Sequence, residues 1–487
     1  MTAWWFENIM KELGERPLRE YAGMDWTVAK ILEATGGRLL QGSPDSHVRS
    51  ISTDTRLIEP GSCFVALIGE NHDGHRFLDK ALEQQAAVLV VAQRRPEAQL
   101  PTAGEAAVVE VPDTLYALGE LARYCRKQVS IPVAGITGSN GKTSTKEMVA
   151  GILSLKHRVL KNQGNFNNLI GVPLTLLSLL PEHQAAVVEM GINVPGEMER
   201  LVEITRPTVG LITNIHPAHL EGLGSLEGIV HEKTFLWEGL GAGHPAVVNL
   251  DDELLVKSSR NLKGPLVTYS LNNPSAHVRL AGAVKVQEDA SVYPLVLGGE
   301  KREVRLPVLG LHQVQNAVAA AAVAWAMGEA PDTIVEGLSR HLPVKQRMQV
   351  HHLPDGGVLI DDSYNANPGS TYAAVQAAHT SSGGHPLLVI LGEMRELGST
   401  SAALHHELGI KIAKLGVSYL ATLGGMGAEI VRGAKEAGMS DTDCRSFGTH
   451  EEILSWLRAN CPAKAWILVK GSRAMAMERV VEGILKA

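Results

Sequence analysis

A short glycine-containing turn constrains this chain more than any other feature of its sequence. The turn reads Thr137-Gly138-Ser139-Asn140-Gly141-Lys142-Thr143. It follows an apolar run from Ile131 to Ile136 that is typical of a buried strand, and it continues through Ser144 into a segment typical of a helix. Glycines let backbone N–H groups close around anionic oxygens, and a helix N-terminus adds partial positive charge. The order of strand, turn and helix therefore predicts a phosphate-binding loop.

Two side chains in this turn suit the chemistry of a nucleotide. We expect Lys142 to reach the outer phosphates and the Thr143 hydroxyl to bind Mg²⁺. The turn departs from the strict Walker A pattern, because Ile136 occupies the position of the first glycine. A glycine turn with a chance Gly-Lys-Thr is the alternative. We favour nucleotide binding, because the strand, the turn and the helix occur in the required order.

Composition excludes several classes of protein. A chain of 487 residues predicts about three domains, and a net charge of −7 gives no reason to expect nucleic acid as a partner. The four cysteines lie far apart without metal-ligand spacing. The first 20 residues lack the apolar core of a signal peptide, and the longest apolar run, Ala317 to Met327, is shorter than the roughly 20 residues of a membrane span. We expect a soluble cytoplasmic protein.

The pattern of apolar runs predicts an α/β protein in four parts. Residues 1–25 form an extension, and three domains follow at 26–129, 130–342 and 343–487. In the second and third domains, apolar strands alternate with helices and are followed at once by polar residues, which is typical of parallel sheets that bind ligands beyond the carboxyl ends of their strands. The strands expected there are Val133–Ile136, Ala185–Glu189, Gly210–Ile215, Ala246–Asn249, Gly357–Ile360, Leu387–Leu391, Ser418–Thr422 and Trp466–Val469.

Polar residues near these strand ends are candidates for a site, although each has a plainer interpretation. Glu189 could hold Mg²⁺ or be a solvated charge, and His216 and His219 could bind a ligand or serve the structure. Lys233 has the pattern of an ordinary surface lysine on a helix. A cluster of asparagines, which includes Asn165 and Asn168, could grip a polar substrate or only shape a turn.

The order of these motifs along the chain resembles the Mur ligase family. The resemblance rests on Thr-Gly-Ser-Asn-Gly-Lys-Thr, Asn-Phe-Asn-Asn-Leu-Ile-Gly-Val-Pro-Leu-Thr, Glu-Met-Gly, Asn-Ile-His-Pro-Ala-His-Leu-Glu-Gly and Asp-Asp-Ser-Tyr-Asn-Ala-Asn-Pro. It extends from about residue 26 to the C-terminus. The N-terminal Asp54-Thr55-Arg56 and the C-terminal Lys470-Gly471-Ser472-Arg473 resemble the members that add a dipeptide.

The resemblance implies a fold and a reaction. It implies a small N-terminal α/β domain for the UDP end of a sugar nucleotide, a central ATP-binding domain with a P-loop ATPase-like parallel sheet, and a C-terminal Rossmann-like domain that presents an amine. The substrates implied are UDP-N-acetylmuramoyl-tripeptide and D-alanyl-D-alanine, used in peptidoglycan precursor synthesis. ATP phosphorylates the carboxylate, and the amine attacks the resulting acyl phosphate with release of phosphate. We expect a monomer without membrane insertion.

The resemblance also assigns roles to residues. It implies that ATP is bound by the turn from Thr137 to Ser144 and by Asn316, beside the adenine. It also implies that Arg347 and Asp362 close over the nucleotide. Thr143 and Glu189 hold one Mg²⁺, and His219 helps bind a second. Lys233 matches a lysine that is carbamylated and supports Mg²⁺ through water. Thr55 and Arg56 are expected on the UDP-sugar side, and Asn365 is expected to help place the dipeptide. Asn165 and Asn168 are expected to bind a substrate. Lys142, His219, Lys233 and Arg347 are the expected catalytic residues.

Other functions remain open at this point. A Mur-family ligase that adds the third peptide residue is the nearest rival, although it usually carries an Asp-Asn-Pro-Arg motif that is absent here. Folylpolyglutamate synthase shares the central logic but should lack the N-terminal UDP-type domain. A non-catalytic ATP-binding module is a rival from another class. The identity of the third peptide residue, diaminopimelate or lysine, is not written in the sequence.

Overall fold

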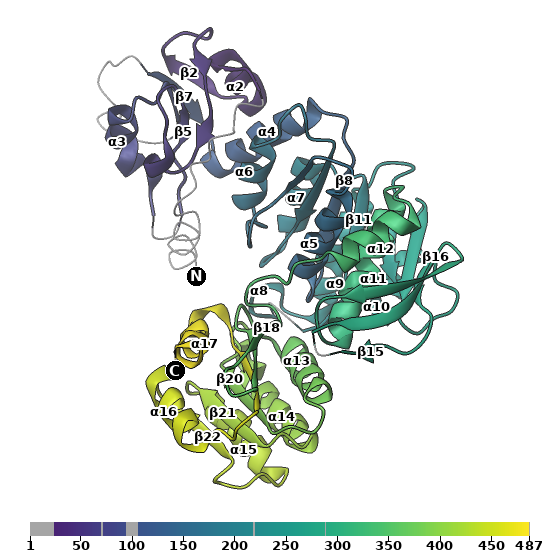
Figure 1. The fold of residues 1–487 in the computed structure, drawn as a ribbon. Coiled ribbons are helices and arrows are strands. Elements are labelled where there is room, and N and C mark those ends of the chain that lie inside the picture. The colour runs from purple at the N-terminus through teal and green to yellow at the C-terminus, as the bar shows by residue number, and fades with distance from the viewer. Residues whose placement is uncertain (1–23, 70–71, 94–105, 218–219, 288, 487) are drawn as a thin grey trace. The chain divides into compact units, whose positions relative to one another are not determined.

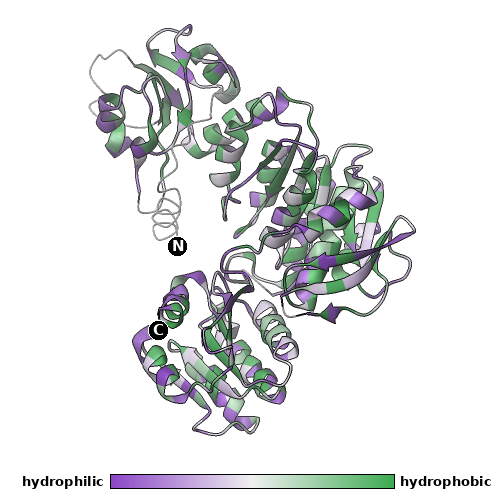
Figure 2. Cartoon of the chain, viewed as in Figure 1, coloured by the Kyte–Doolittle hydropathy of each residue, from purple (hydrophilic) through white to green (hydrophobic). Residues whose placement is uncertain are grey.

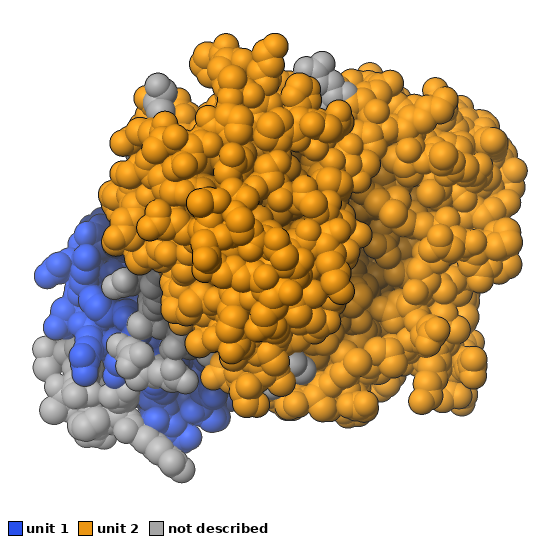
Figure 3. Space-filling view, turned by 90° about the horizontal axis from the view of Figure 1, so that it is seen from below, with its two compact units in different colours: residues 1–135, 156–192, 196–208 blue, residues 136–155, 193–195, 209–487 orange. Residues whose placement is uncertain are grey.

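The computed structural model describes residues 24–69, 72–93, 106–217, 220–287 and 289–486. The chain divides into two compact units, which Figure 3 colours blue and orange. Unit 1 comprises residues 1–135, 156–192 and 196–208, and unit 2 comprises residues 136–155, 193–195 and 209–487. The expected N-terminal extension lies almost wholly outside the described residues.

Unit 1 begins with a five-stranded sheet of order β2-β7-β6-β5-β4 (Figure 1). Strands β4 to β7 pair in parallel, whereas β2 is antiparallel to β7. Phe64, Leu89 and Val108 pack in one core on this sheet. The elements are β1 Trp26–Thr27, α2 Val28–Thr35, β2 Arg38–Gln41, β3 His47–Val48, β4 Ile51–Ser52, η1 Thr55–Leu57, β5 Cys63–Val65, η2 Gly74–Phe77, α3 Leu78–Glu83, β6 Val88–Ala92, β7 Ala107–Val111 and α4 Thr114–Lys127.

The rest of unit 1 consists of two strands and two helices beside the start of β8. Strands β9 and β10 pair in parallel, and the Ala186 N–H of β10 donates to the Pro132 carbonyl just before β8 at 3.0 Å. Helix α4 packs against α2 and also against α6 and α7. The buried Arg126 of α4 donates to the carbonyls of Val129, Ile131, Thr205 and Arg206, which fixes the segment that follows α4. The elements are β8 Val133–Thr137, β9 Val159–Lys161, α6 Gly171–Leu177, β10 Ala185–Glu189 and α7 Glu197–Thr205.

Unit 2 contains the larger part of a second sheet, in the order β8-β11-β12-β13-β14-β16-β15, with β17 paired to β16. Strands β11 to β14 are parallel, as expected, and the strands ending the sheet are antiparallel. The elements are α5 Lys142–Leu153, β11 Val209–Ile212, α8 Leu220–Leu223, α9 Leu226–Glu238, β12 Ala246–Asn249, α10 Glu253–Ser259, β13 Leu266–Ser270, β14 Val278–Leu280, β15 Lys285–Val286, β16 Ser291–Leu297, β17 Glu300–Leu306, α11 Leu311–Ala326 and α12 Pro331–Ser339.

The antiparallel strands from β14 to β17 are absent from the sequence-based prediction of a purely parallel sheet. The β16–β17 hairpin turns at Gly298 and Gly299, and both have positive φ, at 54° and 98°. Two glycines with positive φ suit a two-residue hairpin turn, so a local signal was present. The longest apolar run, which begins at Ala317, lies in α11, and this helix is buried along most of its length.

The C-terminal part of unit 2 is a six-stranded sheet of order β18-β19-β23-β20-β21-β22. All its pairs are parallel except β18 with β19. Alternate residues of the inner strands enter two different cores, one with α13, α14 and α15 and the other with α16 and α17, which is the doubly wound arrangement. The elements are β18 Gln349–His352, β19 Val358–Asp362, α13 Pro368–Ser381, β20 Leu387–Gly392, η4 Gly398–Thr400, α14 Ser401–Lys414, β21 Tyr419–Leu423, α15 Gly427–Glu436, β22 Cys444–Phe447, α16 His450–Asn460, β23 Trp466–Lys470, η5 Arg473–Met475 and α17 Glu478–Leu485.

Hydropathy follows this architecture. Figure 2 shows hydrophobic colour concentrated on the strands, with hydrophilic residues distributed over the outer helices and loops. The four strand predictions for the C-terminal sheet agree with β19, β20, β21 and β23 within two residues at each end. Among the described residues, no helix has the length and apolar character needed to cross a membrane.

Candidate functional site

Two glycines of the predicted phosphate loop have backbone conformations and neighbours that exclude a side chain. Gly138 has φ of 143° and Gly141 has φ of 80°. A Cβ on Gly138 would lie 1.9 Å from the Thr213 hydroxyl oxygen, and a Cβ on Gly141 would lie 2.1 Å from the Asn316 amide oxygen. The loop between β8 and α5 is therefore packed so closely that only glycine fits at these two positions.

Hydrogen bonds fix this loop to the residues that follow β11. The Asn140 N–H donates to Asn214 Oδ1 at 2.9 Å, and the Asn140 carbonyl accepts from the Thr213 hydroxyl at 2.6 Å. The Ser139 hydroxyl bonds the backbone of His216, donating to its carbonyl and accepting from its N–H at 2.9 Å each. Asn214, which follows β11, thus contacts the loop through its side chain. The conformation of the loop is thus set by the neighbouring strand.

The side chains of Lys142 and Thr143 open helix α5. Lys142 Nζ donates to the Gly138 carbonyl at 2.7 Å and lies 3.3 Å from the Ser139 carbonyl. Thr143 is buried, and its hydroxyl accepts from Arg347 Nη2 at 3.0 Å. The Arg347 guanidinium also lies over the Tyr364 ring, 4.2 Å from its centroid. The structure therefore brings together three residues predicted on the ATP site, including one that is 204 positions from its partner.

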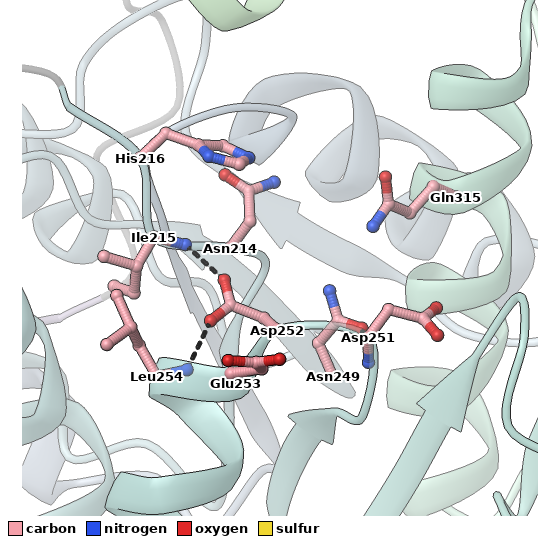
Figure 4. Close-up of a pocket in the computed structure, with 9 residues that line it drawn as sticks. All are labelled: Asn214, Ile215, His216, Asn249, Asp251, Asp252, Glu253, Leu254 and Gln315. Carbon is pink, nitrogen blue, oxygen red and sulfur yellow. Dashed lines mark hydrogen bonds between the residues drawn. The ribbon is translucent and has the colours of Figure 1, made fainter.

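A cavity of about 260 Å³ lies at the carboxyl ends of β11 and β12 (Figure 4). Figure 4 shows Asn249, Asp251 and Gln315 around it, with Asp252 bonded to the N–H groups of Ile215 and Leu254. The predicted adenine residue, Asn316, is the next residue along α11 after Gln315; it is buried, and its amide donates to Gln313 Oε1 at 3.2 Å. The remaining lining residues are Asn214, His216 and Glu253. This polar cavity is where the parallel sheet was expected to bind a ligand.

Lys233 is not the surface lysine that its pattern alone suggests. It lies on α9 with 1% of its surface exposed. Burial lowers the pKa of its amine well below the ordinary value, the nearby Lys142 lowers it further, and Glu232 opposes the shift. A low pKa favours the neutral amine, which is the form that reacts with carbon dioxide.

The C-terminal sheet carries its own charged cluster at the ends of β19 and β23. The buried Lys470 pairs with Asp362 Oδ2 at 2.5 Å and donates to the Asn365 carbonyl at 2.8 Å. Asp362 Oδ1 also accepts from the Met348 N–H at 3.1 Å. His312 is partly buried, and its desolvation, with Lys470, lowers its pKa to about 4 while Asp362 opposes the shift. Two predicted residues, Asp362 and Asn365, thus share one lysine.

In unit 1 the predicted Glu189 ends β10 with 1% of its surface exposed. Its backbone N–H donates to Asn162 Oδ1 at 2.9 Å, and its carboxylate Oε1 accepts from Asn167 Nδ2 at 2.8 Å. Asn168 accepts from the N–H groups of Ile170 and Gly171, which is a turn role. Asn165 Oδ1 is buried and makes no hydrogen bond with another described residue. Asn162 and Asn167, which lie in the same segment as the predicted Asn165 and Asn168, are therefore the asparagines that hold Glu189.

Two further predictions concern the UDP-sugar side, at Thr55 and Arg56, and the second metal ion, at His219. In unit 1, Thr55 is buried, and the Arg56 guanidinium is held by Asp54, with Nη2 and Oδ2 2.7 Å apart; that bond raises the pKa of Arg56. His219 lies outside the described residues, so its predicted metal role stays a prediction.

Comparison with known proteins covers nearly the whole chain. Family models match as the Mur ligase family, catalytic domain (residues 47–126), the Mur ligase middle domain (136–324) and the Mur ligase, glutamate ligase domain (346–473). A UDP-N-acetylmuramoyl-tripeptide–D-alanyl-D-alanine ligase of Escherichia coli is 36% identical over 94% of this chain and 98% of its own length. One from Bacillus subtilis is 33% identical over 95% and 98%.

Solved structures agree with these sequence relatives. A crystal structure of MurF from Acinetobacter baumannii superposes with a TM-score of 0.87 at 32% identity, covering 96% of this chain and all of that chain. A MurF ligase from Thermotoga maritima in complex with ADP has a TM-score of 0.80 at 26% identity, over 90% of this chain and 97% of that one. The likeness extends through all three matched regions.

Proposed function

The chain belongs to the Mur ligase family, and from this premise we propose how its residues join D-alanyl-D-alanine to UDP-N-acetylmuramoyl-tripeptide. It is an ATP-dependent, ADP-forming ligase of peptidoglycan precursor synthesis. Full-length similarity to ligases named for this reaction is the observation that carries the assignment. The route we propose passes through an acyl phosphate, because a free carboxylate has a poor leaving group.

The phosphate loop carries the first step in this proposal. ATP transfers its γ-phosphoryl group to the tripeptide carboxylate, forming a new P–O bond as the bond to ADP breaks. Two anions must approach each other, so fixed positive groups lower the barrier. Lys142, anchored at the start of α5, supplies such a charge, and Arg347 lies against Thr143 at the same loop. The cavity beside Gln315 would take the nucleotide base, with Asn316 and Asp362 as further nucleotide contacts.

Mg²⁺ suits the donors that the chain offers for the nucleotide phosphates. Thr143 offers a hydroxyl and Glu189 offers a carboxylate, which are the hard oxygen ligands that Mg²⁺ prefers. Asn167 holds one carboxylate oxygen of Glu189, which orients the group without replacing its charge. Mg²⁺ held by such ligands would neutralise charge on the phosphates. We propose these two residues as ligands, and His219 as a ligand of a second ion.

Carbamylation of Lys233 is the modification we propose. The neutral amine adds to carbon dioxide, a C–N bond forms, and one proton is released to give a carbamate. Complete burial on α9 and the proximity of Lys142 both favour the neutral amine that this reaction needs. The product carries a negative charge beside Lys142, where the unmodified chain has two lysines. Intact-protein mass measured under carbon dioxide, before and after Lys233→Ala, would detect the added group.

In this proposal, residues beyond the strand ends of the C-terminal sheet serve the second step. The amine of D-alanyl-D-alanine attacks the acyl phosphate, and phosphate leaves from the tetrahedral intermediate. We propose that Asn365, beside Asp362 and Lys470, helps place the dipeptide. In unit 1 we propose Thr55 and Arg56 on the UDP-sugar side and Asn165 and Asn168 as contacts of the muramoyl-peptide. We further propose a cytoplasmic monomer, which light scattering of the purified chain would test.

An assay with defined substrates tests the function directly. ADP release should require both UDP-N-acetylmuramoyl-tripeptide and D-alanyl-D-alanine, and the product should be the UDP-muramoyl-pentapeptide. Turnover of ATP with neither substrate would indicate a plain ATPase and would overturn the proposal. Parallel reactions with diaminopimelate-containing and lysine-containing tripeptides would identify the third residue.

A further inference from the structure

One asparagine of the C-terminal region makes two different hydrogen bonds with the two ends of its side-chain amide. Asn367 is the N-cap of α13, and its Oδ1 accepts from the Ser370 N–H at 2.9 Å. Its Nδ2 donates to Asn140 Oδ1 in the phosphate loop at 2.6 Å. The capping bond fixes which end of the amide is the acceptor, so the Nδ2 group must be the end that faces Asn140.

The backbone of Asn140 is held by hydrogen bonds to residues that follow β11. Its N–H donates to Asn214 Oδ1, and its carbonyl accepts from Thr213 and Asn214 at 2.6 and 3.2 Å. A continuous line of hydrogen bonds therefore runs from the end of β11 through Asn214, Asn140 and Asn367 to the first turn of α13. All members are neutral, and all belong to unit 2.

This line joins the two groups of residues that the reaction must bring together. Asn140 precedes Lys142 and Thr143 by two and three positions, and Asn367 follows Asn365 and Asp362 in the loop after β19. Acyl transfer needs the reacting atoms held about 3–3.5 Å apart. A fixed bond between the loop that binds phosphate and the loop that presents the amine would serve that need.

We propose, on the basis of the proposed function, that Asn367 is a positioning residue that docks the C-terminal substrate loop on the phosphate loop through Asn140. Asn367 contacts protein groups rather than the reacting atoms. Loss of the Asn367 side-chain amide therefore lowers kcat and leaves the affinity for ATP nearly unchanged. Nothing in the capping role of Asn367 predicts that outcome, because a cap stabilises its own helix and is local.

Serine at this position separates the two roles. Serine caps helices about as well as asparagine, but its short side chain cannot reach Asn140. In Asn367→Ser we expect an unchanged thermal midpoint, a kcat about fivefold lower, and a KM for ATP within about twofold of the original, as for the loss of one hydrogen bond. Asn367→Ala should show the same kcat with a lower thermal midpoint, because it loses the cap as well.

The partner and the control complete the design. The double variant Asn140→Ala with Asn367→Ser should have the same kcat as Asn140→Ala alone. Each substitution by itself already removes the hydrogen bond that joins the two residues. Thr449→Ala removes the capping box of α16, a helix that packs in a different core of the C-terminal sheet from that of α13, and it should lower stability without lowering kcat. Additive losses in the double variant, or a kcat for Asn367→Ser equal to that of the original, would overturn the proposal.

Hydrogen exchange tests the docking without any turnover. With ATP bound, amides 138–145 should exchange about fivefold faster in Asn367→Ser than in the original chain or in Thr449→Ala. Equal exchange in all three proteins would refute the docking role. If the original chain made no pentapeptide while this exchange effect was present, the proposed function would fail and the docking role would stand.

Discussion

The phosphate loop differs from the crest of the C-terminal sheet in how its polar side chains are held in place. The crest means the residues at the ends of β19 and β23. Both place polar side chains beyond the carboxyl ends of parallel strands. The loop is held by amide and hydroxyl groups of Thr213 and Asn214. The crest is held by an ion pair between Asp362 and Lys470.

The difference agrees with the ligands that we propose for each region. Neutral hydrogen bonds fix the backbone around Gly138 and Gly141, and Lys142 Nζ donates to carbonyl oxygens of this loop. At the crest, the lysine charge is paired inside the protein, because Lys470 is buried against a carboxylate and a carbonyl. We therefore expect changes of charge at the loop to affect activity and changes at the crest to affect stability first.

Lys142→Ala should have the largest effect on activity. If Lys142 neutralises the transferred phosphoryl group as proposed, loss of its charge should lower acyl phosphate formation by about a thousandfold. The measurement is ADP formed in a single turnover, with the thermal midpoint as a check on folding. Normal product yield from this variant would remove Lys142 from the mechanism.

Lys470→Met should instead lower stability. It leaves Asp362 buried without its cation, which costs about 3 kcal/mol. The shift of the urea unfolding transition measures this loss. Lys470→Met combined with Asp362→Asn should recover most of it, because no unpaired charge remains. A single variant as stable as the original chain would show that the crest does not depend on its ion pair.

Lys233→Ala should lower kcat about thirtyfold if a carbamate stands beside Lys142, a smaller loss than that of the loop lysine itself. Short-chain carboxylic acids should restore part of the activity, since they supply a carboxylate to the vacated space. The exposed Lys257 on α10 is the control, and Lys257→Ala should lose nothing and respond to no acid. Full activity of Lys233→Ala without added acid would refute the carbamate.

His312 should give the smallest effect, through pH. Its pKa falls from 6.5 to about 4 in the folded chain. Below pH 6.5 the unfolded chain binds a proton that the folded chain resists, so stability is fully present above 6.5 and declines as pH falls toward 4. The unfolding midpoint of the original chain should therefore drop more steeply over this range than that of His312→Gln. Parallel profiles would contradict the depressed pKa.

The sequence could predict the parallel strands and their polar ends, because continuous apolar runs with abrupt polar ends are local signals. Lys142, Thr143 and Glu189 were predicted as site residues from such local signals. The burial of Lys233 could not be predicted, because it depends on the packing of α9 and is not encoded in the local pattern. The antiparallel strands from β14 to β17 were missed although Gly298 and Gly299 marked their turn.

Contacts between distant residues were the least predictable part of the site. The sequence Asn367-Pro368 followed by Ser370 signals the start of a helix, but the bond from Asn367 to Asn140 spans 227 positions. The same holds for Arg347 and Thr143. No local pattern specifies such pairs, because they arise only when whole sheets have folded.

Oxygen-isotope transfer tests the central claim most directly. The tripeptide carboxylate is labelled with ¹⁸O, the complete reaction is run, and the released inorganic phosphate is analysed by mass. Transfer of one labelled oxygen to phosphate is the predicted result, because the acyl phosphate passes its bridging oxygen to the leaving group. Phosphate free of label, with pentapeptide formed normally, would contradict activation of the carboxylate by ATP.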